Sequence, residues 1–207
     1  MNDFLSRSIE VQNWGWNILT VGAVGTVVLT PFQVWGLWKQ ARAIWGGHSG
    51  KSISIPMLGF QLVYFGAFLI YAWSVPSVAM VLNCILMVPI AFGVAGLLRY
   101  KWHHLAQWGI VVFLGGFIPA MIYLPKEIVL GALYVPLFGV LLHQGYEVWR
   151  NGPGVIDPTF VKIFIITGVF WIAFTFAAGE WIIFFFNCLA APVWIYIFWK
   201  WRKTRVV

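Results

Sequence analysis

The segment VLNCIL, residues 81–86, lies inside an apolar run that extends from Val75 to Leu98. Asn83 in this segment carries a primary amide with two donors and two acceptor lone pairs, and lipid satisfies none of them. An amide in such a run either bonds a neighbouring helix or faces a water-filled cavity. The same dipeptide recurs 104 residues later as Asn187-Cys188, inside the last apolar run. This recurrence indicates that the chain contains two related units.

The composition around these segments is that of a membrane protein. The 207 residues are 61% hydrophobic and only 9% charged, whereas about a quarter of the residues in a soluble domain are charged. Because a spanning helix needs about 20 apolar residues, the chain can hold about seven spans with short loops. We expect spans over residues 14–38, 55–73, 78–98, 105–124, 128–149, 158–178 and 181–199. The fold class is therefore an all-α membrane protein with seven transmembrane helices.

The charged residues predict how the chain is oriented. Of the 13 Lys and Arg residues, all but Arg7 and Lys126 fall in the connections and tail on one side of the predicted spans. Cytoplasmic loops collect Lys and Arg, so this distribution predicts an N-terminus outside and a C-terminus inside. The first 13 residues lack an apolar core and a cleavage site, and we do not expect a signal peptide. The net charge of +7 is explained in the same way and does not indicate nucleic acid.

Prolines repeat with nearly the same spacing as the asparagines. Pro31 and Pro136 are 105 residues apart, and Pro56 and Pro158 are 102 apart. Pro89 and Pro192 follow at a spacing of 103. We expect a first three-helix repeat at 14–99, a linker helix at 103–124 and a second three-helix repeat at 128–201. Because one span separates them, the two units are parallel repeats related by an axis along the membrane normal, with a substrate site at their interface.

Two loop motifs next to these prolines resemble a known family. The first unit contains Pro31-Phe32-Gln33, then Ser49-Gly50-Lys51-Ser52-Ile53-Ser54, then Pro56. The second unit contains Pro136, a Gly152-Pro153-Gly154 loop, Pro158, Trp171 and Asn187. Together they resemble the PQ-loop, SWEET and SemiSWEET transporter superfamily, and the 3+1+3 arrangement is similar to that of the SWEET sugar transporters. The resemblance extends from the first span to the last.

The resemblance implies roles for particular residues. In the family, an Asn of each third span and an aromatic or small polar residue of each second span line the solute pocket. The matching positions here are Asn83, Asn187 and Trp171, with Tyr64 as a candidate in the first unit. The family's hinge prolines match four residues: Pro31, Pro56, Pro136 and Pro158. The position in the first unit that corresponds to Trp171 is left open, because the shift of 104 leads to Ala67 and several aromatic residues lie near it.

Each candidate also has a structural interpretation. Asn83 and Asn187 could be interhelical hydrogen-bonding residues, which contribute about 0.6 kcal/mol on average in membranes. Trp171 could be an interfacial anchor, since the chain has 14 Trp, although a place in the middle of a span argues against this. Gln33 either gates the pathway or caps the carbonyls that Pro31 leaves without a partner. Pro31 and Pro119 are expected to interrupt their spans, whereas Pro56 and Pro158 open theirs.

These features predict an alternating-access facilitator for a small neutral polar solute, a sugar. Amides suit hydroxyl groups because they offer donors and acceptors without charge. The alternatives are an amino-acid or metabolite carrier with the same fold, and a membrane receptor that binds without transport. We find no signature of an enzyme, a cofactor or a metal site in the sequence, and no mid-span charge that would couple transport to an ion.

The expected location is the plasma membrane or a bacterial inner membrane, and the expected partners are a small-molecule solute and the lipid bilayer. Seven spans can enclose a pathway in one chain, so transport does not require a homo-oligomer, although it is compatible with one.

Overall fold

The computed structural model describes residues 2–46, 55–151 and 158–204. Within these ranges the chain is helical apart from short connections, and seven helices are long and apolar enough to cross a membrane. The prediction of an all-α membrane protein with seven spans is therefore confirmed. The loop motifs at residues 49–54 and 152–154 lie outside the described ranges.

The helices are α1 Asn2–Arg7, α2 Ile9–Gln12, α3 Ile18–Gly46, α4 Ile55–Ser74, α5 Val78–Asn83, the 3₁₀ helix η1 Cys84–Leu86, α6 Met87–Lys101, α7 Leu105–Gly115, α8 Phe117–Tyr123, α9 Lys126–Asn151, α10 Pro158–Ala178 and α11 Trp181–Thr204. The first span, α3, is longer at its C-terminal end than predicted. Its last turns are helical because Trp45 packs there on α6. The Trp45 ring stacks on Phe92 at 5.1 Å, and its indole N–H donates to the Phe92 carbonyl at 3.0 Å.

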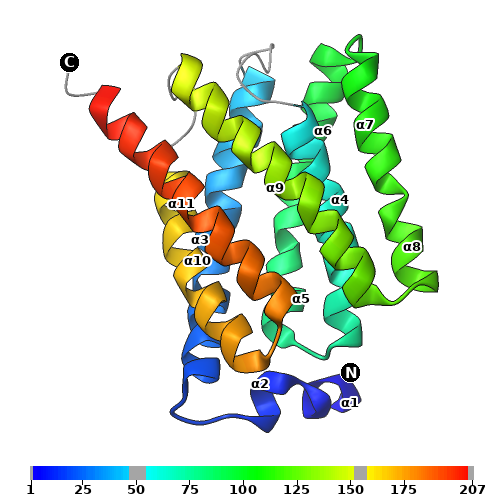
Figure 1. Ribbon diagram of the computed structural model, residues 1–207, viewed down its shortest axis with the longest axis vertical. Helices are drawn as coiled ribbons and strands as arrows, with labels where there is room; N and C mark the ends of the chain where they lie inside the picture. Colours follow the sequence, from blue (N-terminus) through cyan, green and yellow to red (C-terminus); the bar gives the residue numbers. More distant parts are fainter. Residues whose placement is uncertain (1, 47–54, 152–157, 205–207) are drawn as a thin grey trace.

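The helices form one bundle in which the two ends differ (Figure 1). The N-terminal helices α1 and α2 lie at one end, and the C-terminus lies at the other. The C-terminal end also holds most of the described cations, including Arg42 near the end of α3, Arg99 near the end of α6 and Arg150 near the end of α9. The short turns at the N-terminal end carry few of them.

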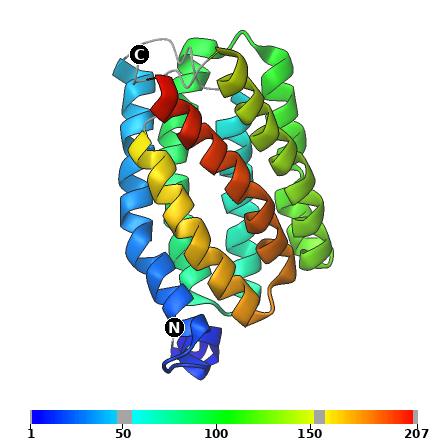
Figure 2. The same cartoon turned by 60° about the vertical axis from the view of Figure 1, so that its left-hand side comes forward.

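The packing of the helices follows a regular order (Figures 1 and 2). α3 packs against α5 and α6, which pack against α4. Likewise α9 packs against α11, which packs against α10. The helices thus form two groups, one of α3 to α6 and one of α9 to α11. Two further contacts join the groups, α3 with α10 and α4 with α9. α7 and α8 pack on the outside of α4, and α8 also reaches α9.

Only some of the span prolines accompany a break in a helix. Pro31, Pro136 and Pro192 lie inside helices that continue past them, so the predicted interruption at Pro31 is wrong. Proline removes one backbone donor and crowds the carbonyl four residues earlier. At Pro89 this carbonyl belongs to Ile85, which lies within the 3₁₀ turn between α5 and α6. At Pro119 it belongs to Gly115, where α7 ends.

α3 and α10 approach each other so closely that two glycines are required. A Cβ on Gly22 would lie 2.6 Å from the backbone nitrogen of Phe174, and a Cβ on Gly25 would lie 2.1 Å from the Phe170 ring. Close approach of this kind at small residues is the usual way in which membrane helices gain packing energy. We call this close contact between α3 and α10 the α3–α10 seam.

Candidate functional site

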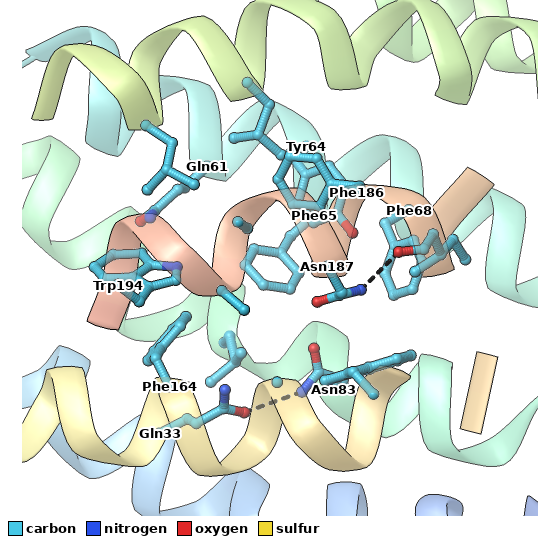
Figure 3. A pocket seen from close by; sticks show the side chains of 18 of the residues that line it. Gln33, Gln61, Tyr64, Phe65, Phe68, Asn83, Phe164, Phe186, Asn187 and Trp194 are labelled. Carbon is cyan, nitrogen blue, oxygen red and sulfur yellow. Dashed lines mark hydrogen bonds between the residues drawn. The ribbon is translucent and has the colours of Figure 1, made fainter. Parts of the chain in front are cut away.

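A cavity of about 140 Å³ lies inside the bundle. Its walls come from α3, α4, α5, η1, α9, α10 and α11. The lining includes the four residues that the sequence proposed for a solute pocket, Tyr64, Asn83, Trp171 and Asn187, and also Gln33, the proposed gate residue. Figure 3 shows Gln33, Tyr64, Asn83 and Asn187 with their neighbours at close range. The described lining residues carry no charge.

Asn83 is the last residue of α5 and is held from α3. It is buried, and its amide nitrogen donates to the Thr30 hydroxyl at 3.2 Å and to the Gln33 side-chain carbonyl at 3.2 Å. Both of its donors are thereby used within the protein. Its amide oxygen points into the cavity toward Asn187 (Figure 3). Asn83 therefore offers a fixed acceptor to a solute.

Asn187 faces the same cavity from α11 but has a different partner. Its amide nitrogen donates to the Ile183 carbonyl of its own helix at 2.8 Å, and its oxygen points away from that bond (Figure 3). The prediction of a paired amide site is consistent with this geometry, although the two amides are not equivalent. Among the residues that the structure describes, the hydrogen bond of Asn187 is to its own helix, so its side chain can turn without breaking a hydrogen bond between helices.

Gln33 belongs to the cavity wall. Its carbonyl accepts the bond from Asn83, and its NH₂ group points into the open space (Figure 3). Pro31 leaves the Val27 carbonyl without its helical donor. To cap that carbonyl, the NH₂ group of Gln33 would have to turn back along α3. The geometry therefore favours a Gln33 side chain that faces the cavity over one that caps the Val27 carbonyl. With the oxygens of Asn83 and Asn187, it supplies the donor and acceptors that hydroxyl groups require.

Phe68 is the candidate that the structure offers for the position that the sequence left open in the expected first unit. Phe68 and Trp171 both line the cavity, and their rings meet edge to face at 6.0 Å. Ala67, to which the shift of 104 leads, is fully buried and does not line the cavity. A shift of 103, the spacing of Pro89 and Pro192, would have found Phe68.

Tyr64 contributes its ring to the cavity, while its hydroxyl is used elsewhere. The hydroxyls of Tyr64 and Tyr134 are 2.9 Å apart and join α4 to α9. The Tyr64 ring stacks on Phe68 at 5.4 Å, and the Tyr134 ring stacks on Phe186 at 4.4 Å. Tyr64 is thus both an apolar wall and a link between the two groups of helices.

A third link lies closer to the end that holds the N-terminal helices. The Tyr71 hydroxyl on α4 donates to the carboxylate of Glu180, in the turn between α10 and α11. This turn is tight because Gly179 adopts a φ of 75°, a conformation open to glycine. Burial raises the pKa of the Glu180 carboxyl, the bond from Tyr71 lowers it, and the nearby Glu127 raises it. Three successive turns of α4 therefore contact the other group of helices through Tyr64, Phe68 and Tyr71.

The predicted hinge prolines lie outside the cavity lining. Pro31 and Pro136 lie within α3 and α9, Pro56 is in the first turn of α4, and Pro158 is the first residue of α10. Their predicted role is one of movement, and it stays a prediction.

The sequence did not single out several cavity residues. They are Gln61, Phe65, Phe164, Phe186 and Trp194, together with smaller aliphatic residues. The helical period could have found some of them, because Gln61, Phe65 and Phe68 follow one another at spacings of four and three on α4. Gln61 adds a fourth amide to the wall.

Within the described ranges, no group of three or more His, Cys, Asp or Glu residues could hold a metal ion. Cys84 and Cys188 are free thiols. The site is an uncharged cavity with amides on aromatic walls. Comparisons with protein-family models, with curated proteins and with solved structures find no match to this chain.

Proposed function

We propose that this chain is a SWEET-like transporter that moves a small neutral polar solute, a sugar, across the membrane by alternating access. The observation that supports this most directly is the cavity, in which the amides of Gln33, Asn83 and Asn187 face aromatic walls. Hydroxyl groups can bond the amides while the apolar face of a sugar ring stacks on aromatic rings. The uncharged lining favours a neutral solute and transport without ion coupling.

The order of helix packing supports two parallel repeats. In this proposal α3, α4 and α5–α6 form the first unit, and α9, α10 and α11 form the second. A two-fold axis along the bundle would exchange α3 with α9 and α4 with α10. It would then exchange the two contacts that join the units, α3 with α10 and α4 with α9. The cavity would lie on this axis, where repeat transporters bind their substrates.

The distribution of cations supports an N-terminus outside and a C-terminus inside. In that orientation the Tyr71–Glu180 link lies near the outer face, and the links from Tyr64 and Phe68 close the wall of the cavity itself. They would have to separate for a solute to enter from outside. The proposed cycle therefore opens and closes these links while the close α3–α10 seam is kept.

Flux into reconstituted vesicles tests this function. Purified protein would be placed in vesicles, and uptake of labelled mono- and disaccharides would be measured with and without the double substitution Asn83→Ala and Asn187→Ala. We expect saturable uptake that the double variant loses. Absence of uptake, or uptake unaffected by the double variant, would refute the proposal.

Two other outcomes identify the alternatives. Uptake of amino acids that depends on a pH gradient would indicate a coupled carrier with the same fold. Saturable solute binding without flux would indicate a membrane receptor.

A further inference from the structure

The third span of the proposed first unit is divided at the cavity, whereas that of the second unit is continuous. α5 has only six residues, and η1 separates it from α6. α11 runs for 24 residues through Pro192. A helix of fewer than two turns is not stable by itself and depends on contacts to hold its position. Asn83 lies at the end of this short helix.

The start of α5 is held by a carboxylate from the N-terminal segment. Glu10 of α2 is buried, and its Oε1 atom accepts from the Ser77 hydroxyl at 2.6 Å and from the Ala79 N–H at 3.0 Å. Its Oε2 atom accepts from the Val78 N–H at 3.1 Å. Hydrogen bonds to a charged group contribute more than neutral ones. One side chain thus binds three consecutive residues at the beginning of α5.

Further contacts place Glu10 for this task. The Ile9 N–H donates to the Pro76 carbonyl at 2.8 Å, so the backbone of α2 is joined to the turn that precedes α5. Phe4 on α1 stacks on Trp73 near the end of α4, with ring centroids 4.8 Å apart. Ser8 is fully buried. The N-terminal segment is therefore docked on the α4–α5 turn and brings Glu10 to it.

We propose that Glu10 is a positioning residue for Asn83. α5 is held at its first turn by Glu10 and at its last residue by Thr30 and Gln33, so the carboxylate determines where the Asn83 amide stands in the cavity. Asn187 needs no such support because α11 is continuous and holds its own asparagine. The part of the inference that concerns solute rests on the proposed function, whereas the part that concerns α5 does not.

Thiol labelling tests the position of α5 without any solute. Cys84 is buried directly after Asn83 and would be the reporter in a Cys188→Ser background. We expect Glu10→Gln, which keeps the volume but turns an NH₂ group toward backbone donors, to speed modification of Cys84 about tenfold, the change that corresponds to one hydrogen bond to a charged group. Asp3→Asn is the matched control, because Asp3 is an exposed acid of the same segment.

A second reporter separates a local effect from general loosening. In a Cys84→Ser background, modification of Cys188 should not change in Glu10→Gln. Equal acceleration at Cys84 and Cys188, or no acceleration at Cys84, would overturn the inference.

A double-mutant cycle then tests the path to the solute. We expect Glu10→Gln to weaken binding of the transported sugar, and to have no further effect when Asn83 is already Ala. Additive losses would show that Glu10 does not act through Asn83. If Cys84 responds as expected while the wild-type protein neither binds nor moves a sugar, the transport proposal fails and the role of Glu10 in placing α5 stands.

Discussion

Gly22→Ala should destabilise the protein by forcing α3 away from α10. The new Cβ would lie 2.6 Å from the backbone nitrogen of Phe174, 2.8 Å from its Cα and 2.9 Å from its Cβ. Non-bonded heavy atoms prefer about 3.5–4.0 Å, so the two helices would have to separate by about 1 Å. Overpacking costs about 1–3 kcal/mol, and a backbone obstacle cannot rotate away. The higher helix propensity of Ala returns about 1 kcal/mol, so the net loss relative to wild type is up to about 2 kcal/mol.

Two comparison variants make this prediction sharper. Gly109 on α7 has nothing within 4 Å of an added Cβ, so Gly109→Ala should be as stable as wild type or more stable. Gly25→Ala meets the Phe170 ring, which is a side chain, so shortening Phe170 to Leu should recover part of the loss. No change in the Phe174 side chain should rescue Gly22→Ala, because its obstacle includes backbone atoms.

The assay is reversible unfolding in mixed micelles, followed by Trp fluorescence. The protein supplies a strong signal because it contains 14 Trp. If the stability of Gly22→Ala lies within about 0.5 kcal/mol of that of Gly109→Ala, the scatter expected of substitutions that meet no obstacle, the close α3–α10 seam does not exist as described.

Three other substitutions or conditions address the site. Asn187→Ala should weaken sugar binding about tenfold with little loss of stability, because the hydrogen-bond partner of Asn187 is in its own helix, whereas Asn83→Ala should lower both sugar binding and stability. Isothermal titration would measure sugar binding, and thermal unfolding would measure stability. Equal losses of stability in the two variants would contradict the prediction. The raised pKa of Glu180 favours its protonated form in the folded protein. Its contribution to thermal stability should therefore be fully present below the ordinary value of 4.5 and be lost as the pH rises through the raised value. Glu180→Gln should remove this part of the pH dependence of stability, and a pH dependence unchanged in the variant would contradict the prediction. Trp171→Leu should lower the affinity for sugar about tenfold through loss of ring stacking, with flux at saturating sugar much less affected. Uptake into vesicles should therefore show a raised KM with a nearly unchanged Vmax. A lower Vmax at unchanged KM would contradict the prediction.

The spans could be predicted because their signals are local. A run of apolar residues marks each helix, and Pro56 and Pro158 mark the first turns of α4 and α10 within a residue of where they begin. The paired cavity amides, Asn83 and Asn187, could be predicted because they recur at the spacing of the prolines. Each of these signals is contained in one short segment or in one constant shift.

The unequal partners of the two asparagines could not be predicted. Asn83 bonds Thr30 and Gln33, which lie 53 and 50 residues away on α3. Which rotamer each amide adopts depends on side chains that meet only in the packed bundle. Glu10 was missed for a related reason, because an acid in a polar N-terminal segment looks like any solvated charge until its partners at the start of α5 are known.

The distance along the chain between Glu10 and its donors has a consequence for biogenesis. Ser77 follows Glu10 by 67 residues. At about 5–20 residues per second, the ribosome therefore completes the acid about 3–13 s before it supplies the donors. During that interval α3 and α4 must both cross the bilayer, so that Ser77 emerges on the same face as Glu10. A nascent chain in which only one of these two spans crosses the bilayer leaves the acid and its donors on opposite faces. The contact of Glu10 with the start of α5 can therefore form only after both α3 and α4 have crossed the bilayer, before the rest of the chain is made.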